Sequence, residues 1–202
     1  AGSGVKVYVI DTGVAANATQ LGSRLLAGRD LTFSGSTTDC NGHGTHVAGS
    51  IASATYGVAK QAKIVPLKAL DSFGTCQGSG STSFVLSAID WAISDNPAGT
   101  RAVINMSLGS SDLTNSAAMT TAINNAIADG IVVVVAAGNE TKDACQVTPA
   151  LTPAAITVGA IDQTFHEGYF SNYGACVDIF APGVNVTSLD FDNPTGSAVM
   201  SG

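Results

Sequence analysis

The sequence predicts an α/β fold, a doubly wound parallel sheet with helices on both faces. Short runs rich in Val and Ile alternate along the chain with longer segments whose apolar residues recur at helical spacing. The short runs are almost continuously apolar, which is typical of strands that covering helices bury on both sides. No linker, internal repeat or low-complexity segment divides the 202 residues, so we expect a single domain.

The first half of the chain supplies two expected strands and two expected helices. The runs "VKVYVI" (5–10) and "AKIVPLKAL" (62–70) are short and apolar, which favours strands. Between them, "THVAGSIAS" (45–53) is expected to be a helix. The segment "STSFVLSAIDWAI" (81–93) is also expected to be a helix, because its apolar residues repeat every three to four positions.

The second half continues the alternation. "RAVINMSL" (101–108) is expected to be a strand, and "NSAAMTTAINNAIADG" (115–130) a helix that stops at its final glycine. The strand "IVVVVAA" (131–137) follows directly. Two more runs, 154–161 and 176–182, are expected to complete the sheet.

Composition excludes two classes of partner. The net charge is −7, which repels a phosphate backbone, so we expect no nucleic-acid partner. The longest apolar run, 131–137, is far shorter than the roughly 20 residues that cross a bilayer, so we expect no membrane partner. Apolar residues make up 45% of the chain and charged residues only 11%, which indicates a globular protein with a neutral surface. We expect a monomer.

The four cysteines, Cys40, Cys76, Cys145 and Cys176, are widely spaced and form no C-x-x-C pair. A zinc or redox motif is therefore not indicated. An even number of cysteines favours two disulfides formed in an oxidising compartment, and hence a secreted, extracellular protein. Four separate buried thiols remain an alternative.

Polar side chains gather where the expected strands end. Asp11 follows the first strand, Ser107 and Gly109 follow a central one, and Asn139 follows "VVVVAA". In a parallel sheet, ligands bind beyond these carboxyl ends. Each residue also has a simpler interpretation: an aspartate can cap a turn, and an asparagine after glycine commonly forms one.

Two histidines, His43 and His46, stand at the mouth of the helix expected at 45–53. A zinc site is not indicated, because no third ligand is placed to complete it. We expect His46, one helical turn into the apolar face, to be a core residue. His43 then remains as the candidate functional imidazole.

The motifs together are more specific than any one residue. In chain order they are "VYVIDTG", "NGHGTHVAG", "INMSLGS", "VVVAAGNE" and "FAPG". This set resembles the subtilisin-like serine proteases, specifically the proteinase K and aqualysin branch, over almost the whole chain from Gly4 to Gly202. The resemblance implies a subtilisin-like three-layer α/β fold whose C-terminal part is missing, and a serine endopeptidase activity.

The resemblance also implies catalytic roles. Asp11 corresponds to the triad carboxylate, His43 to the general base, and Asn139 to the side chain that donates to the oxyanion. The residues after "FAPG" are expected to form a loop ending at Ser201-Gly202, with Thr and the catalytic Ser as the next two residues. Residues 1–202 would then be a single peptidase domain, incomplete at the C-terminus and short at the N-terminus, and inactive alone.

The substrate-binding residues are likewise implied by the family. The backbone of an extended substrate would pair with two short segments of small residues: Gly78, Ser79, Gly80, Ser107, Leu108 and Gly109. Gly109 also belongs to an open apolar specificity pocket, together with Ala136, Ala137, Gly138, Thr148, Pro149 and Ala150. Such a pocket should accept aromatic or large aliphatic side chains.

A structural Ca²⁺ site is implied as well. The carbonyl groups of Pro153 and Ala155 and the carboxylate of Asp178 would be its ligands, since Ca²⁺ prefers oxygen. Asp178 could instead simply pair with a turn. The family pattern further implies disulfides joining Cys40 to Cys76 and Cys145 to Cys176.

The expected partners are protein or peptide substrates, the protein's own propeptide and the missing C-terminal segment. A rival hypothesis is a non-catalytic binding protein with the same fold, or an inactive fragment. A nucleotide-binding or phosphoaspartyl domain is the more distant alternative. It would need a Gly-rich phosphate loop after the first strand, and "DTGVAANA" does not supply one.

Overall fold

The structure is a computed structural model that describes residues 1–16 and 18–202. Its centre is a sheet of seven parallel strands in the order β2-β3-β1-β4-β5-β6-β7. A separate antiparallel pair, β8-β9, lies beside it. The strands are β1 (Lys6–Asp11), β2 (Arg29–Asp30), β3 (Lys63–Lys68), β4 (Ala102–Met106), β5 (Ile131–Ala136), β6 (Ile156–Ile161), β7 (Ile179–Pro182), β8 (Val186–Leu189) and β9 (Ser197–Met200).

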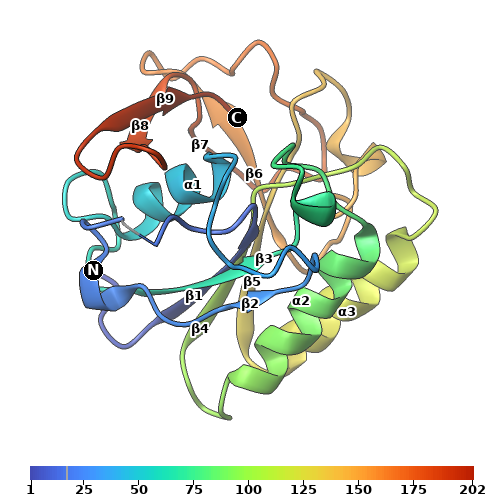
Figure 1. Ribbon diagram of the computed structural model, residues 1–202. Helices are drawn as coiled ribbons and strands as arrows, with labels where there is room; N and C mark the ends of the chain where they lie inside the picture. Colours follow the sequence, from blue (N-terminus) through green and yellow to red (C-terminus); the bar gives the residue numbers. More distant parts are fainter. Residues whose placement is uncertain (17) are drawn as a thin grey trace.

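Three α-helices cover the sheet, with α1 on one face and α2 and α3 together on the other (Figure 1). The α-helices are α1 (His43–Ala52), α2 (Thr82–Asp95) and α3 (Ser116–Ala128). Three short 3-10 turns lie in the loops: η1 (Gly22–Arg24), η2 (Ser72–Gly74) and η3 (Ala144–Gln146). The predicted parallel sheet with helices on both faces is confirmed.

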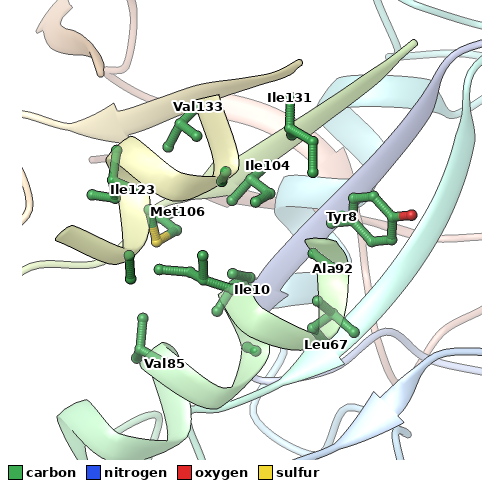
Figure 2. Close-up of a cluster of buried hydrophobic side chains, with 14 of the residues drawn as sticks. Tyr8, Ile10, Leu67, Val85, Ala92, Ile104, Met106, Ile123, Ile131 and Val133 are labelled. Carbon is green, nitrogen blue, oxygen red and sulfur yellow. The ribbon is translucent and has the colours of Figure 1, made fainter. Parts of the chain in front are cut away.

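Alternation along β1 shows how one strand serves two cores. Tyr8 and Ile10 point toward α2 and α3 and belong to the larger core cluster. Val7 and Val9 point the other way, into the cluster under α1. Successive side chains of a strand face opposite sides of the sheet, so a strand buried on both faces must be apolar at nearly every position. Figure 2 shows the larger cluster, where Ile104, Met106 and Ile123 pack with Ile10.

The helix boundaries have local causes. The hydroxyl oxygen of Ser81 accepts a hydrogen bond from the Ser83 N–H and so caps the start of α2. The helix α3 ends at Ala128, and Gly130 follows with φ +87°, a left-handed conformation that glycine adopts without steric cost. The sequence predicted that this glycine would stop the helix.

The C-terminal stretch differs from the expectation of a loop. Val186–Leu189 and Ser197–Met200 form the antiparallel pair β8-β9. Tertiary contacts with α1 stabilise it: the Ser188 hydroxyl donates to the carbonyl oxygen of His46 at 2.7 Å, and the His46 Nε2–H donates to the carbonyl oxygen of Val186 at 3.0 Å. These contacts join residues 140 or more positions apart, so no local pattern announces the pair.

One part of the α1 face of the sheet is uncovered. On β5, Ile131 and Val133 are buried against the helices α2 and α3, so Val132 points to the opposite face. The strand register places Ile156 of β6 and Ile179 of β7 on that same face. Their exposed fractions are 46% for Val132, 41% for Ile156 and 56% for Ile179. An apolar sheet face thus remains open to solvent beyond α1.

Within the described part of the chain, no helix combines the length and the apolar character needed to cross a membrane.

Candidate active site

An aspartate and a histidine meet at the carboxyl end of the central strand. Asp11 is the last residue of β1, and His43 is the first residue of α1. The His43 Nδ1 lies 2.7 Å from Asp11 Oδ1, so the imidazole donates its Nδ1 proton to the carboxylate. The Asp11 side chain is fully buried, whereas the His43 side chain is 41% exposed. The carboxylate therefore orients an imidazole whose other edge faces the cleft.

The electrostatics of this pair favour a base. The hydrogen bond that His43 donates to Asp11 raises the pKa of His43 above its ordinary value of 6.5. Burial opposes this, and the negative charges of Asp11 and Asp39 add to the rise. Among the described residues, none bonds to His43 Nε2. In the neutral imidazole Nδ1 carries the proton, so Nε2 has a free lone pair that can accept a proton.

Asp39 stabilises the turn that precedes His43. Sequence inspection did not identify Asp39 as part of the site. It is 4% exposed and precedes His43 by four residues. Its carboxylate accepts hydrogen bonds from the hydroxyl groups of Thr12 and Thr45 and from the N–H groups of Asn41, Gly42 and Thr45. Gly42, the residue before α1, has no side chain for capping, so neighbouring side chains accept from the first N–H groups of the helix. Asp39 accepts from Thr45, whereas the His43 and Gly44 N–H groups donate to Asn41 Oδ1 and Thr12 Oγ1. The only local signal was an acidic residue shortly before a helix.

A cleft of about 490 Å³ opens beside His43. It brings together nine of the residues that the sequence placed at the site: His43, Gly78, Ser79, Gly80, Ser107, Leu108, Gly109, Thr148 and Pro149. Val85 of α2 and Met119 of α3 give it an apolar part. Two backbone segments of small residues, 78–80 and 107–109, therefore line the cleft that contains the imidazole.

Other predicted pocket residues do not line this cleft. Ala137 and Ala150 are each 1% exposed and pack with Ala144 and Val147 in a small separate cluster. Ala136 ends β5 and is half-buried. The side chains of Ala137 and Ala150 therefore contribute to packing in that cluster.

Asn139 lies on the turn after β5, and its side chain is available for binding. The residue is exposed, and its carboxamide bonds to no described residue. The backbone of Gly202 passes close to it, since a methyl group added to Gly202 would lie 3.4 Å from Asn139 Nδ2. The Gly202 N–H donates to the carbonyl oxygen of Gly183 at 2.8 Å.

Two disulfides are present, joining Cys40 to Cys76 and Cys145 to Cys176. The first links the turn before His43 to the loop that leads into 78–80. Asn41 strengthens this link, because its Nδ2 donates to the carbonyl oxygen of Cys76 at 3.0 Å. The cleft wall and the imidazole are therefore tied together covalently.

A buried ion pair supports the same region. Lys68 Nζ lies 2.8 Å from Asp71 Oδ2, and both side chains are at most 3% exposed. Lys68 also donates to the carbonyl oxygen of Thr38, and Asp71 accepts from the Cys76 N–H. The ion pair thus links the segment before Cys40 to the loop that contains Cys76, the same two segments that the first disulfide joins. Sequence inspection did not identify it.

The three residues considered for Ca²⁺ lie around the start of β6. Asp178 is exposed, and its Oδ2 accepts a hydrogen bond from the Thr157 N–H at 2.8 Å. Among the described residues, no loop hydrogen bond ends on the carbonyl oxygens of Pro153 or Ala155. An oxygen-only donor set with carbonyls left over fits a hard cation such as Ca²⁺.

The remaining histidines have partners of their own. His46 is 6% exposed, bonds to the Val186 carbonyl, and has a pKa lowered chiefly by burial. His166 is exposed and bonds to the hydroxyl of Thr164. In the described residues, the one cluster of potential metal ligands is Cys40, Asp71 and Cys76, whose cysteines are oxidised to a disulfide.

Comparison with known proteins gives a consistent result. The family model described as the subtilase family, peptidase S8, matches residues 2–201. The chain is 48% identical over 202 residues to an extracellular serine proteinase of Thermus sp. (strain Rt41A), which covers all of this chain and 47% of that protein. It is 42% identical over 202 residues to alkaline serine exoprotease A of Vibrio alginolyticus, covering all of this chain and 36% of that protein.

A solved structure is also similar throughout. The crystal structure of a cold adapted subtilisin-like serine proteinase matches with a TM-score of 0.90 and 43% identity, covering 100% of this chain and 70% of that one. The chain spans about half the length, or less, of the curated relatives it matches.

Proposed function

The chain belongs to the subtilase family, and on this basis we propose that the protein is a serine endopeptidase that hydrolyses peptide bonds of proteins. The observation that carries the proposal is the buried Asp11 bonded to His43 at 2.7 Å, beside a cleft of about 490 Å³ that His43 lines. An imidazole oriented by a carboxylate, with its second nitrogen free, is the base that activates a serine hydroxyl.

The nucleophile in this proposal is a serine just beyond Gly202. Its Oγ attacks the substrate carbonyl carbon while His43 Nε2 takes the hydroxyl proton. His43 then gives that proton to the leaving amine as the peptide C–N bond breaks, and water hydrolyses the acyl-enzyme by the same route. Asp11 stabilises the imidazolium that forms in each half of the reaction. The closeness of Gly202 to Asn139 supports this placement of the next residues.

Asn139 is the oxyanion donor in this scheme. Its carboxamide is exposed and unpaired among the described residues, so it can donate Nδ2–H to the oxygen of the tetrahedral intermediate. Such a donor contributes mainly in the transition state, where the oxygen carries negative charge.

The substrate binds as an extended strand along segments 78–80 and 107–109, which both line the cleft. Aromatic or large aliphatic side chains should be preferred, because Leu108, Val85 and Met119 line the cleft and no Asp, Glu, Lys or Arg of the described residues does.

Fluorophosphonate labelling of the full-length protein tests the proposal. We expect one serine just past Gly202 to be labelled, with the site mapped by mass spectrometry, and we expect His43→Ala to abolish labelling. Labelled Ser197 or Ser201 would contradict the assignment of the nucleophile. Folded protein that takes up no label would favour the alternative, a subtilase-fold protein that binds a partner without catalysis.

We also propose a structural Ca²⁺ held by the carbonyls of Pro153 and Ala155 and by Asp178. Bound Ca²⁺ would offset the negative charge of Asp178 and join the start of β6 to the segment before β7. Ca²⁺ at about 100 times its dissociation constant should raise the melting temperature by about 5–10 °C, since binding to the native state alone is then worth about 2.7 kcal/mol.

Calorimetry with and without a chelator measures this shift in the full-length protein. Asp178→Asn should remove most of the difference, whereas Asp162→Asn, at an exposed loop after β6, should retain it. An equal chelator effect in the parent and in Asp178→Asn would rule out this ligand set.

The remaining proposals concern the whole protein. Two disulfides and the name of the Thermus relative support secretion into an extracellular, oxidising environment. We propose a monomeric protein whose single peptidase domain extends beyond residues 1–202. Its own propeptide and the segment after Gly202 are its intramolecular partners, and the open apolar face over Val132, Ile156 and Ile179 is where that segment packs.

A further inference from the structure

Asn172 is fully buried behind the turn that carries Asn139, and its side chain uses its whole hydrogen-bonding capacity on that turn. Nδ2 donates to the carbonyl oxygen of Ala137 at 2.9 Å and to Glu140 Oε2 at 2.7 Å. Oδ1 accepts from the N–H groups of Glu140 at 3.0 Å and of Lys142 at 3.1 Å. A buried carboxamide with both donors and both acceptor sites filled has one orientation.

The turn itself is built around Asn172. Gly138 has φ +106°, and a β-carbon there would lie 2.3 Å from Asn172 Nδ2 and 2.6 Å from Glu140 Oε2. Only glycine therefore fits between β5 and the buried carboxamide. The backbone N–H of Asn172 also donates to the carbonyl oxygen of Gly138 at 3.0 Å.

Glu140 relays this restraint to Asn139. Its Oε2 accepts both from Asn172 Nδ2 and from the backbone N–H of Asn139, the latter at 3.1 Å. The backbone of Asn139 is thus held from behind through one carboxylate, while its own carboxamide projects on the exposed side without a partner among the described residues.

We propose that Asn172 is a positioning residue for catalysis: through the 137–142 turn it holds the Asn139 carboxamide where the oxyanion forms, without touching substrate. The inference rests on the proposed role of Asn139. An oxyanion donor accelerates the reaction only when it is already aimed, because reorienting it during the reaction would consume the energy it supplies.

Other contacts keep the turn folded when the Asn172 side chain is removed. The Thr141 N–H and hydroxyl donate to the carbonyl oxygens of Phe170 and Tyr169, and the Tyr173 N–H donates to that of Lys142. Asn172→Ala should therefore fold with a loosened turn, which separates positioning from global unfolding.

Steady-state kinetics of the full-length protein on a peptide substrate test the proposal. We expect Asn172→Ala to lower kcat by about 10²-fold, the effect of a misplacement of about 1 Å, with KM within about twofold of the parent. Asn139→Ala should lower kcat by about 10²–10³-fold, a magnitude measured in the relative subtilisin. In the double variant, Asn172→Ala should add less than about threefold, because the donor it positions is already absent.

Asn96→Ala is the matched control. Asn96 is also a buried asparagine, 5% exposed, but it follows the end of α2 and its Nδ2 donates to the Thr100 carbonyl. Its replacement should lower stability and leave kcat unchanged. Equal losses of kcat in Asn96→Ala and Asn172→Ala, or multiplying effects of Asn172→Ala and Asn139→Ala, would overturn the inference.

Amide hydrogen exchange measures how firmly Asn172 holds the 137–142 turn, and it does not require the protein to be catalytically active. In Asn172→Ala, the Glu140 and Lys142 amides should exchange at least about tenfold faster, while the amides of β5 stay protected. Unchanged exchange at both positions overturns the inference whether or not the parent hydrolyses peptides. A parent protein without labelling or hydrolysis, by contrast, would defeat the proposed function.

Discussion

His43→Ala is expected to lower kcat of the full-length protein by about 10⁶-fold, the loss measured for the triad histidine of the relative subtilisin. The physical reason is that, in the proposed mechanism, His43 Nε2 takes the serine proton, and water cannot replace it in a fixed position. His166→Ala is the control, because His166 is exposed on a loop after β6 and should leave kcat unchanged. A His43→Ala variant that kept one hundredth of the parent rate would contradict the assignment.

Asp11→Asn should lower kcat by about 10⁴-fold, because the amide disfavours the tautomer with the proton on Nδ1. It should also shift the pH dependence. In the proposed mechanism only neutral His43 acts as a base, so we expect activity to appear as pH rises through the pKa of His43, which Asp11 raises above 6.5. Removing the carboxylate should move this acid limb to lower pH. The profile of kcat/KM against pH measures the shift, and an unmoved limb would mean that another group titrates there.

The second large effect concerns stability. Lys68→Met should reduce the free energy of unfolding by about 3–5 kcal/mol, because it leaves the buried Asp71 carboxylate without its cation. Burial by itself raises the pKa of Asp71, but the hydrogen bonds and charge of Lys68 and the backbone N–H groups outweigh it, so the pKa is lowered. The ionised Asp71 carboxylate therefore stabilises the folded protein at pH values above the ordinary pKa of 3.8. This stabilisation is lost as the pH falls through the lowered pKa of Asp71.

Urea unfolding of the full-length protein at neutral pH measures this effect. Lys6→Met is the matched control, since Lys6 and Asp95 form an ion pair whose side chains are 24% and 35% exposed. That change should cost about 0–1 kcal/mol. The double variant Lys68→Met/Asp71→Leu should regain part of the loss, because it buries no unpaired charge. Equal losses of unfolding free energy in Lys68→Met and Lys6→Met would show that the buried ion pair stabilises the protein no more than the partly exposed one.

The sheet was predictable because burial on both faces leaves a strong local signal. Strand β5 is five valines and isoleucines in a row before Ala136, and any strand with helices on both sides must have such a run. The pair β8-β9 lacked this signal. Residues such as Thr187, Ser188 and Ser197 give no apolar alternation, and the strands are stabilised by α1 instead of by their own pattern.

The candidate site was predictable only in part. Asp11, His43 and Asn139 stand at the ends of recognisable strands or helices within motifs, so their order in the chain was informative. Asp39, Lys68 and Asn172 carry no comparable signal. Asn172 lies 30 or more residues from the turn it holds, and an isolated asparagine in sequence most often indicates a surface turn.

The sequence alone determined the α/β class, the alternation of the main strands and helices up to β7, and the identity of the chemical groups at the strand ends, because periodicity and motif spacing are local properties. The short strand β2 and the pair β8-β9 were not among them. Only the tertiary structure decided which groups touch. It placed Asp11 Oδ1 2.7 Å from His43, buried Ala137 and Ala150 away from the cleft, and put Asn172 behind Asn139. Burial and hydrogen-bond partners arise when segments far apart in sequence pack together, so no local pattern contains them.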